Sequence, residues 1–166
     1  MSHSHPELSE PAALEKGTTR IVALGGLGDV GRNMTVFEHD GKILIVDAGV
    51  LFPEENQPGV DLILPDFSYL RERWGDVLAI VLTHAHEDHI GAVPFVLREA
   101  GEIPLVGSRL TIAFIEEKLK EYRIRPRSLE VKEGQVEQFG PFNLEFIAVN
   151  HSIPDALAIA ITTSAG

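Results

Sequence analysis

The sequence has 166 residues, 44% of them hydrophobic and 23% charged, and a formal net charge of −11, which suits one globular domain and argues against a basic face for non-specific nucleic-acid binding. It has no cysteine, which excludes disulfides and thiolate metal sites, so any metal has to use histidine and carboxylate ligands. No apolar run reaches the about 18 residues of a membrane span and no signal peptide is evident, so we expect a soluble, cytoplasmic protein with no membrane partner.

Residues 1–18 are polar, contain several Ser, Pro and Glu residues, and show no hydrophobic period. This composition predicts a disordered N-terminal tail, because too little apolar surface is available to offset the entropy cost of ordering. The folded region is therefore expected to span residues 19–166.

A strand predicted over residues 19–24 is followed by the glycine-rich loop 25–31, in which Gly26, Gly28 and Gly31 fit the spacing G-x-G-x-x-G of dinucleotide-binding folds. That fingerprint requires a helix directly after the glycines. Residues 33–39 and 42–47 instead predict two strands joined by an Asp40-Gly41 hairpin turn. A nucleotide-binding module using Gly25–Gly31 is thus the weakest hypothesis, and glycines that permit a tight turn or a close approach to a ligand are the better account.

Residues 51–66 predict a long loop with several prolines and acidic side chains. Its segment 54–66 offers carboxylates that could bind Ca²⁺, although a solvated loop is the simpler interpretation. Residues 67–74 predict a short helix and residues 77–82 a buried strand. A second helix is predicted over residues 88–100, with Asp88 as its N-cap.

Four side chains able to bind a transition metal fall within six positions between that strand and that helix: His84, His86, Asp88 and His89. Neutral imidazoles and a carboxylate suit zinc, manganese or iron(II). Alternation in an extended turn can direct His84 and His86 to one ion, and Asp88 and His89 to a second. The alternative is a set of polar turn residues that cap a helix, but a metal better explains how such a cluster avoids mutual repulsion.

The rest of the chain predicts a strand over residues 103–106, an amphipathic helix over 109–122 and four period-two strands over 128–132, 135–139, 142–149 and 156–162. The helix is expected to turn Leu110, Ala113, Phe114 and Leu119 inward. The last strand has no further strand after it to pair with.

The segment Thr83–His89 resembles the signature of the metallo-β-lactamase superfamily, whose members hydrolyse esters, amides and phosphodiesters with one or two bound metals. The resemblance implies an α/β fold, the first part of a four-layer αββα sandwich with mixed sheets inside and helices outside. It also implies that Asp47 hydrogen-bonds a metal-binding histidine and fixes its orientation, with a turn-capping aspartate as the alternative. His151 becomes the third ligand of the His84/His86 metal, where a lone histidine after a strand would otherwise be an ordinary loop residue.

Residues 25–34, 52–66, 83–94 and 151–155 further resemble the ribonuclease J family, in the β-CASP branch of that superfamily, and the likeness runs from about residue 21 to the end. It implies an RNA-processing ribonuclease that cuts internally and 5′ to 3′ from a 5′-monophosphorylated single strand. In that family two zinc ions, or Mn²⁺ or Mg²⁺, activate a water, here on His84, His86 and His151 and on Asp88 and His89, and the whole enzyme is expected to be a homo-oligomer.

The family pattern continues with a bridging aspartate and a final histidine that this sequence does not contain. We therefore expect residues 19–166 to be the N-terminal portion of a metallo-β-lactamase domain, with the β-CASP and C-terminal domains outside the chain. Two alternatives stay open: another hydrolase of the same fold, and an inactive metal-binding fragment with an exposed apolar strand edge.

Overall fold

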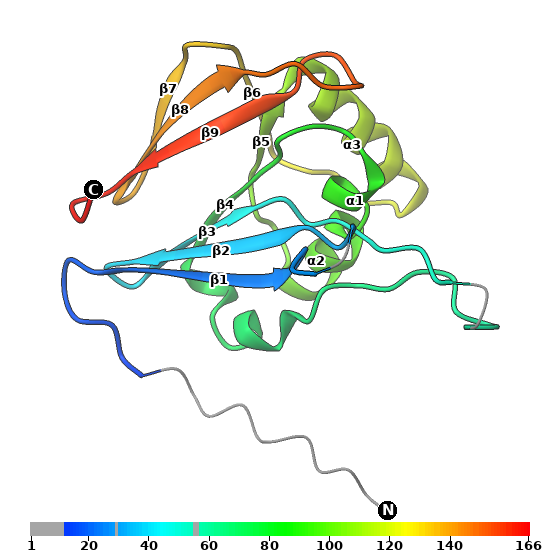
Figure 1. Ribbon diagram of the computed structural model, residues 1–166, viewed down its shortest axis with the longest axis horizontal. Coiled ribbons are helices and arrows are strands. Elements are labelled where there is room, and N and C mark those ends of the chain that lie inside the picture. Colours follow the sequence, from blue (N-terminus) through cyan, green and yellow to red (C-terminus); the bar gives the residue numbers. More distant parts are fainter. Residues whose placement is uncertain (1–11, 29, 55–56) are drawn as a thin grey trace, which may run out of the picture.

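The computed structural model describes residues 12–28, 30–54 and 57–166, and Figure 1 shows two β-sheets with helices over one of them. The predicted disordered tail falls mostly on residues 1–11, which lie outside this description. Among the described residues, no helix is long and apolar enough to span a membrane.

The larger sheet has six strands that neighbour one another in chain order: β1 (Thr19–Gly25), β2 (Met34–His39), β3 (Lys42–Val46), β4 (Val77–Val81), β5 (Leu105–Ser108) and β6 (Ser128–Val131). β1, β2 and β3 pair antiparallel, whereas β3 to β6 pair parallel. The predicted hairpin turn between β2 and β3 is confirmed, since Asp40 and Gly41 both have positive φ, at 46° and 73°. The sheet is mixed, as the family resemblance implied.

The smaller sheet is antiparallel and has the order β7 (Val136–Phe139), β8 (Phe142–Ala148), β9 (Leu157–Thr162). In β8 the side chains of Phe142, Leu144 and Phe146 are buried while the intervening residues are exposed, which confirms the predicted period of two. These three pack with buried residues of the larger sheet, among them Leu44 and Val81, and so form a core between the two sheets.

The other face of the larger sheet is covered by α1 (Glu87–Ile90), α2 (Val93–Ala100) and α3 (Arg109–Glu121), with the 3₁₀ helices η1 (Phe67–Leu70) and η2 (Trp74–Asp76). A second, larger core lies there and includes Ile45, Ile80, Val96 and Ile115. The described residues thus form three layers, helices, sheet and sheet, of the expected αββα sandwich.

The helix predicted over residues 88–100 is divided in two. Ala92 interrupts the helical hydrogen bonds, because its main-chain N–H donates to Ala48 O at 2.8 Å. The N-cap of α1 is His86 rather than Asp88, and Asp88 lies inside the turn. The prediction of Asp88 as N-cap was therefore wrong, because His86 O already accepts from the N–H groups of His89 and Ile90 and the turn begins before Asp88.

The predicted inward face of α3 was also largely wrong. Its buried residues are Thr111, Ile112, Ile115 and Leu119, while Phe114 is 51% exposed. Apolar residues surround the first half of this helix, so the spacing alone does not select one face. Packing against β5, β6 and α2 selects it. The single helix predicted over residues 67–74 is likewise replaced by η1 and η2.

Candidate metal centre

The candidate site lies beyond the carboxyl ends of β3 and β4, which run parallel and therefore end at the same edge of the sheet. Asp47 directly follows β3, and its N–H donates to Val81 O at the end of β4 at 2.9 Å. His84 and His86 lie in the turn that leads from β4 to α1, and His151 lies between β8 and β9. Three separate connections thus supply the side chains.

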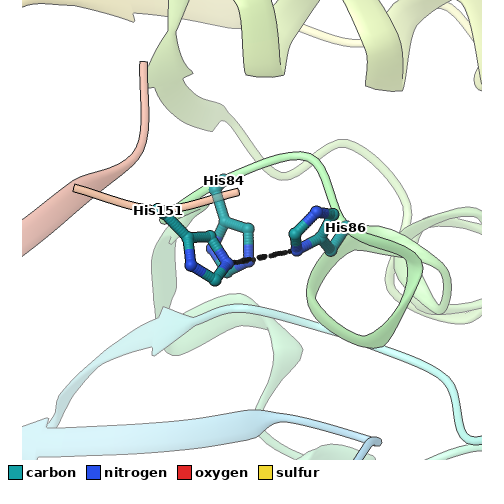
Figure 2. A group of neighbouring side chains, drawn as sticks. All are labelled: His84, His86 and His151. Carbon is teal, nitrogen blue, oxygen red and sulfur yellow. Dashed lines mark hydrogen bonds between the residues drawn. The ribbon is translucent and has the colours of Figure 1, made fainter. Parts of the chain in front are cut away.

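The imidazoles of His84, His86 and His151 converge on one point, and Figure 2 shows the three rings turned toward one another. His84 Nε2 lies 3.0 Å from His86 Nδ1 and 3.1 Å from His151 Nε2, and the last two nitrogens are 3.2 Å apart. Nitrogens bound to a tetrahedral zinc at the usual bond length lie about 3.3 Å apart. The spacing of this trio therefore suits one transition-metal ion.

The neighbouring groups determine which ring nitrogen of His84 carries the proton and which has the lone pair. Thr83 Oγ1 lies 2.9 Å from Asp47 Oδ2, and it must donate there because an ionised carboxylate only accepts. The same oxygen therefore accepts from His84 Nδ1, 2.9 Å away. With its proton on Nδ1, His84 presents the lone pair of Nε2 to His86 and His151. At most one N–H can point at that lone pair, so a cation is the partner that satisfies all three rings.

A second pair of possible ligand atoms lies beside the trio. His89 Nε2 is 3.3 Å from Asp88 Oδ2, and the rings of His84 and His89 have centroids 4.0 Å apart. His89 Nδ1 lies 2.7 Å from Asp47 Oδ2, which places a proton on Nδ1, so that Nε2 carries the lone pair in the neutral form of the ring that a metal would require. Asp47 thus contacts His89 in the way that a carboxylate orients a metal-binding histidine.

The pKa values of two histidines in the cluster are shifted in opposite directions. Burial is the main cause that lowers the pKa of His84 to about 4, and the nearby imidazoles of His89, His151 and His86 lower it further. His84 is therefore neutral, as a ligand has to be, at neutral pH. Burial also lowers the pKa of His89, but the hydrogen bond and charge of Asp47, with the charge of Asp88, outweigh it and raise this pKa overall.

We call residues 83–90, the turn after β4 together with α1, the metal-site turn. Its main chain is hydrogen-bonded to two other segments. The carbonyl groups of α1 accept from N–H groups outside the helix: those of Glu87, Asp88 and His89 accept from Val50, Asn33 and Ala48 over 3.1, 3.0 and 2.7 Å. Gly49 lies so close that a Cβ there would be 1.5 Å from Asp88 O. Only glycine fits at this position, and the contact sets how deeply α1 lies against the end of β3.

Two residues at the site were not singled out from the sequence. Thr83 bonds Asp47 and His84 through one hydroxyl, and its place between an apolar strand and the histidines was the available signal. Asn33 Nδ2 lies 3.1 Å from Asp88 Oδ2, although the two residues are 55 positions apart. No spacing rule links residues so distant, so only the folded chain reveals Asn33.

The glycine-rich loop has a structural role that fits the close-approach interpretation. Gly26 and Gly28 have φ of 81° and 80°, and a Cβ at Gly26 would lie 2.6 Å from Asn33 Oδ1. β2, which pairs antiparallel with β1, follows the loop where a dinucleotide fold requires a helix. The structure therefore gives the nucleotide-binding hypothesis no support.

The acidic loop does not form a comparable cluster. In its described part, Asp66 accepts from Ser68 N at 2.9 Å and caps η1. Among all described residues, the histidine trio is the group whose ligand atoms converge closely enough to hold a metal ion. The Ca²⁺ hypothesis for residues 54–66 thus gains nothing from the described geometry.

Comparison with known proteins places this geometry in a family. The family model described as "Metallo-beta-lactamase superfamily" matches residues 27–163. Ribonuclease J of Mycobacterium tuberculosis (strain CDC 1551 / Oshkosh) is 56% identical over 160 residues, which cover 96% of this chain and 29% of that protein. Ribonuclease J2 of Bacillus subtilis (strain 168) is 41% identical over 149 residues, covering 89% of this chain and 27% of that protein. The chain thus spans less than a third of the length of these curated relatives.

A solved structure described as a new diphosphatase from the PhnP family has the same fold, with a TM-score of 0.61 at 19% identity over 87% of this chain and 62% of that one. The expected fold class is therefore confirmed. Since the family match extends over most of the sequence and includes every residue of the candidate metal centre, the chain belongs to the metallo-β-lactamase superfamily.

Proposed function

We propose that this chain supplies part of the catalytic centre of a metal-dependent ribonuclease that acts in RNA processing and decay. The observation that carries the proposal is the convergence of three imidazole nitrogens within 3.2 Å, beside Asp88 and His89, in a chain 56% identical to a Ribonuclease J. Further features belong to the proposal for the whole protein: 5′-to-3′ exonuclease and endonuclease activity, a 5′-monophosphorylated single strand as substrate, a cytoplasmic location and homo-oligomerisation.

The residues divide into two sets by the atoms that they present. His84 Nε2, His86 Nδ1 and His151 Nε2 would hold one ion, for which zinc is the best match to three imidazoles. Asp88 Oδ2 and His89 Nε2 would hold a second, for which Zn²⁺, Mn²⁺ or Mg²⁺ are candidates. Two bound divalent ions would lower the pKa of a shared water and offset the charge that grows on the scissile phosphate.

The protein's own contribution is to orient the imidazole rings and to fix the positions of their protons. Asp47 Oδ2, 2.7 Å from His89 Nδ1, holds a proton on that nitrogen, and Thr83 Oγ1 does the same at 2.9 Å for His84 Nδ1. The Nε2 atoms of both rings would thereby remain available as metal ligands. Asp88 would supply a carboxylate ligand, which suits a divalent cation better than a further neutral group. The acidic net charge of −11 is then compatible with an RNA substrate, since bound cations reverse the local field.

The first test is the metal content of the chain after exhaustive dialysis, measured by elemental analysis for zinc and manganese. Two ions per chain would support both sets of ligands. One ion would support the histidine trio alone. No bound ion would contradict a site that this chain can form by itself.

The second test is cleavage of an end-labelled, 5′-monophosphorylated single-stranded RNA by the metal-loaded chain, with chelator as the blank. Asp88→Ala is expected to abolish cleavage and to leave the far-UV circular dichroism spectrum unchanged, while the exposed loop variant Asp61→Ala is the matched control. Hydrolysis of a generic phosphodiester without RNA cleavage would favour another hydrolase of this fold. Metal binding without any turnover would favour the inactive metal-binding fragment.

A further inference from the structure

Asn33 contacts the second set of ligands from a different segment of the chain. It lies between the glycine-rich loop and β2, and its Nδ2 is 3.0 Å from Asp88 O, 3.1 Å from Asp88 Oδ2 and 3.2 Å from His89 Nε2. Its main-chain N–H also donates to Asp88 O at 3.0 Å. One residue thus reaches the carbonyl, the carboxylate and the neighbouring imidazole of the metal-site turn.

The orientation of this amide follows from its neighbours. A carbonyl and a carboxylate only accept hydrogen bonds, so Asp88 O and Asp88 Oδ2 require that the NH₂ end of Asn33 faces the Asp88–His89 pair. In the neutral form of His89, whose proton Asp47 holds on Nδ1, Nε2 accepts as well. The oxygen end faces Gly26, where a Cβ would lie 2.6 Å from Oδ1, so a glycine at position 26 makes room for the amide.

We propose that Asn33 is a positioning residue for the second metal subsite, the Asp88/His89 pair. Gly26 leaves the space that the Asn33 amide needs in this orientation. The amide fixes the Asp88–His89 turn so that Asp88 Oδ2 and His89 Nε2 lie 3.3 Å apart. The inference rests on the two-metal assignment proposed above. Within the described chain, none of the hydrogen bonds of Asn33 goes to the histidine trio, so its effect is specific to one subsite.

The chemistry of an amide suits this role better than a charged donor. A lysine or arginine could satisfy the same acceptors, but its charge would repel a divalent ion at this distance. A neutral amide orients the carboxylate without that repulsion. The contact with His89 Nε2 uses the one lone pair of that nitrogen and would give way to a bound metal. Two other contacts go to Asp88 O, a main-chain acceptor outside the proposed ligand set, and these are compatible with metal binding.

The test measures the two metal dissociation constants separately, by Zn²⁺ titration against a chromophoric chelator. In Asn33→Ala the weaker, second constant is expected to rise 10- to 100-fold, the usual effect of removing a group that orients a metal ligand, while the first changes less than about twofold. Asn143→Ala, which removes an exposed amide on β8, is the matched control. Gly26→Ala should reproduce the Asn33→Ala result. An unchanged second constant, or an equal loss at both subsites, would overturn the proposal.

A second measurement keeps this inference separate from the two-metal assignment. In chelator-treated protein, the side-chain NH₂ protons of Asn33 should exchange with solvent at least tenfold more slowly than those of Asn143, and their NMR signals should shift in Asp88→Ala. If Asn33 exchanges as fast as Asn143, it does not hold the turn and the proposal fails. If wild type binds one ion only while the Asn33 protons are protected, the two-metal assignment fails and the hold on Asp88 stands.

Discussion

The position of a single proton on each imidazole decides what the candidate site can bind. Asp47 anchors the arrangement, because it accepts from Thr83 at 2.9 Å and pairs with His89 at 2.7 Å. Thr83 passes the orientation on to His84, whose Nδ1 donates to the same hydroxyl. One buried carboxylate therefore aims the Nε2 lone pairs of two rings into the site. Its removal should disturb both rings, although it is not itself placed as a ligand.

Asp47→Asn should lower the pKa of His89. The carboxylate of Asp47 is the main cause that raises this pKa against the effect of burial, so the amide leaves burial opposed only by the charge of Asp88. His89 stabilises the folded protein at pH below its unfolded pKa, and this contribution is lost as pH rises through its raised folded pKa. Histidine NMR titration of chelator-treated protein measures the change. Asp61→Asn is the control, and an unchanged His89 pKa would contradict the assignment of this pair.

His84 should make the metal-free protein sensitive to acid. Its pKa is lowered to about 4 in the folded protein. As pH falls from about 6.5 towards 4, this histidine is therefore protonated in the unfolded chain but still neutral in the folded one. The free energy of unfolding is therefore expected to decrease over that window. Urea unfolding with chelator at several pH values measures it. The decrease should be smaller in His84→Ala, and an identical pH profile in the two proteins would contradict the prediction.

At the scale of elements, the metal-site turn owes its position to neighbouring segments more than to its own helix. α1 comprises Glu87–Ile90, too short to be stable through helix propensity. Its carbonyls accept from the segments before β2 and after β3, and Gly49 has no side chain to obstruct the approach of Asp88 O. The end of β3 therefore acts as the platform against which Asp88 and His89 are presented.

Gly49→Ala should damage both stability and metal binding. The added Cβ would lie 1.5 Å from Asp88 O and 1.9 Å from Asp88 C, and neither main-chain atom can move without moving the ligands. The free energy of unfolding should fall by about 3 kcal/mol or more, at or above the upper end for overpacking. Gly75→Ala, where nothing lies within 4 Å, is the matched control. Urea unfolding and metal content measure the outcome, and a Gly49→Ala protein like wild type would refute this account.

At the scale of the whole molecule, the two sheets enclose a core while β9 forms an edge of the smaller sheet. One face of β9 turns Leu157, Ile159 and Ile161 toward that core, and Ala158 and Ala160 are exposed on the other. An edge strand with small, uncharged side chains presents unpaired main-chain groups that can pair with another chain. The hypothesis of an exposed apolar strand edge therefore has a specific location.

The 166-residue chain should self-associate through β9, and Ala160→Lys should reduce this. A lysine on an edge strand opposes pairing because its charge has to remain solvated. Sedimentation velocity over a range of concentrations measures the mass-average size. Ala113→Lys, an exposed change on α3 that adds the same charge, is expected to leave self-association unchanged. A wild-type chain that stays monomeric at every concentration would contradict the prediction.

The sequence by itself determined those features that depend on neighbours within a few positions. The alternation in β8, the Asp40-Gly41 hairpin and the crowding of His84, His86, Asp88 and His89 into one turn could all be predicted, because backbone geometry relates such residues directly. Family resemblance extended this to Asp47 and His151. The fold class followed from the same resemblance, and the predicted strand and helix periods agreed with it.

Only the tertiary structure decided the features that join distant segments. The division of α1 from α2, the buried face of α3 and the contact of Asn33 with Asp88 across 55 positions each depend on which surfaces meet. The same holds for the ring nitrogens, because Thr83 and Asp47 select them through hydrogen bonds. Local spacing fixes what residues can reach along the chain, whereas packing and hydrogen-bond satisfaction in the folded molecule choose among partners that are remote in sequence.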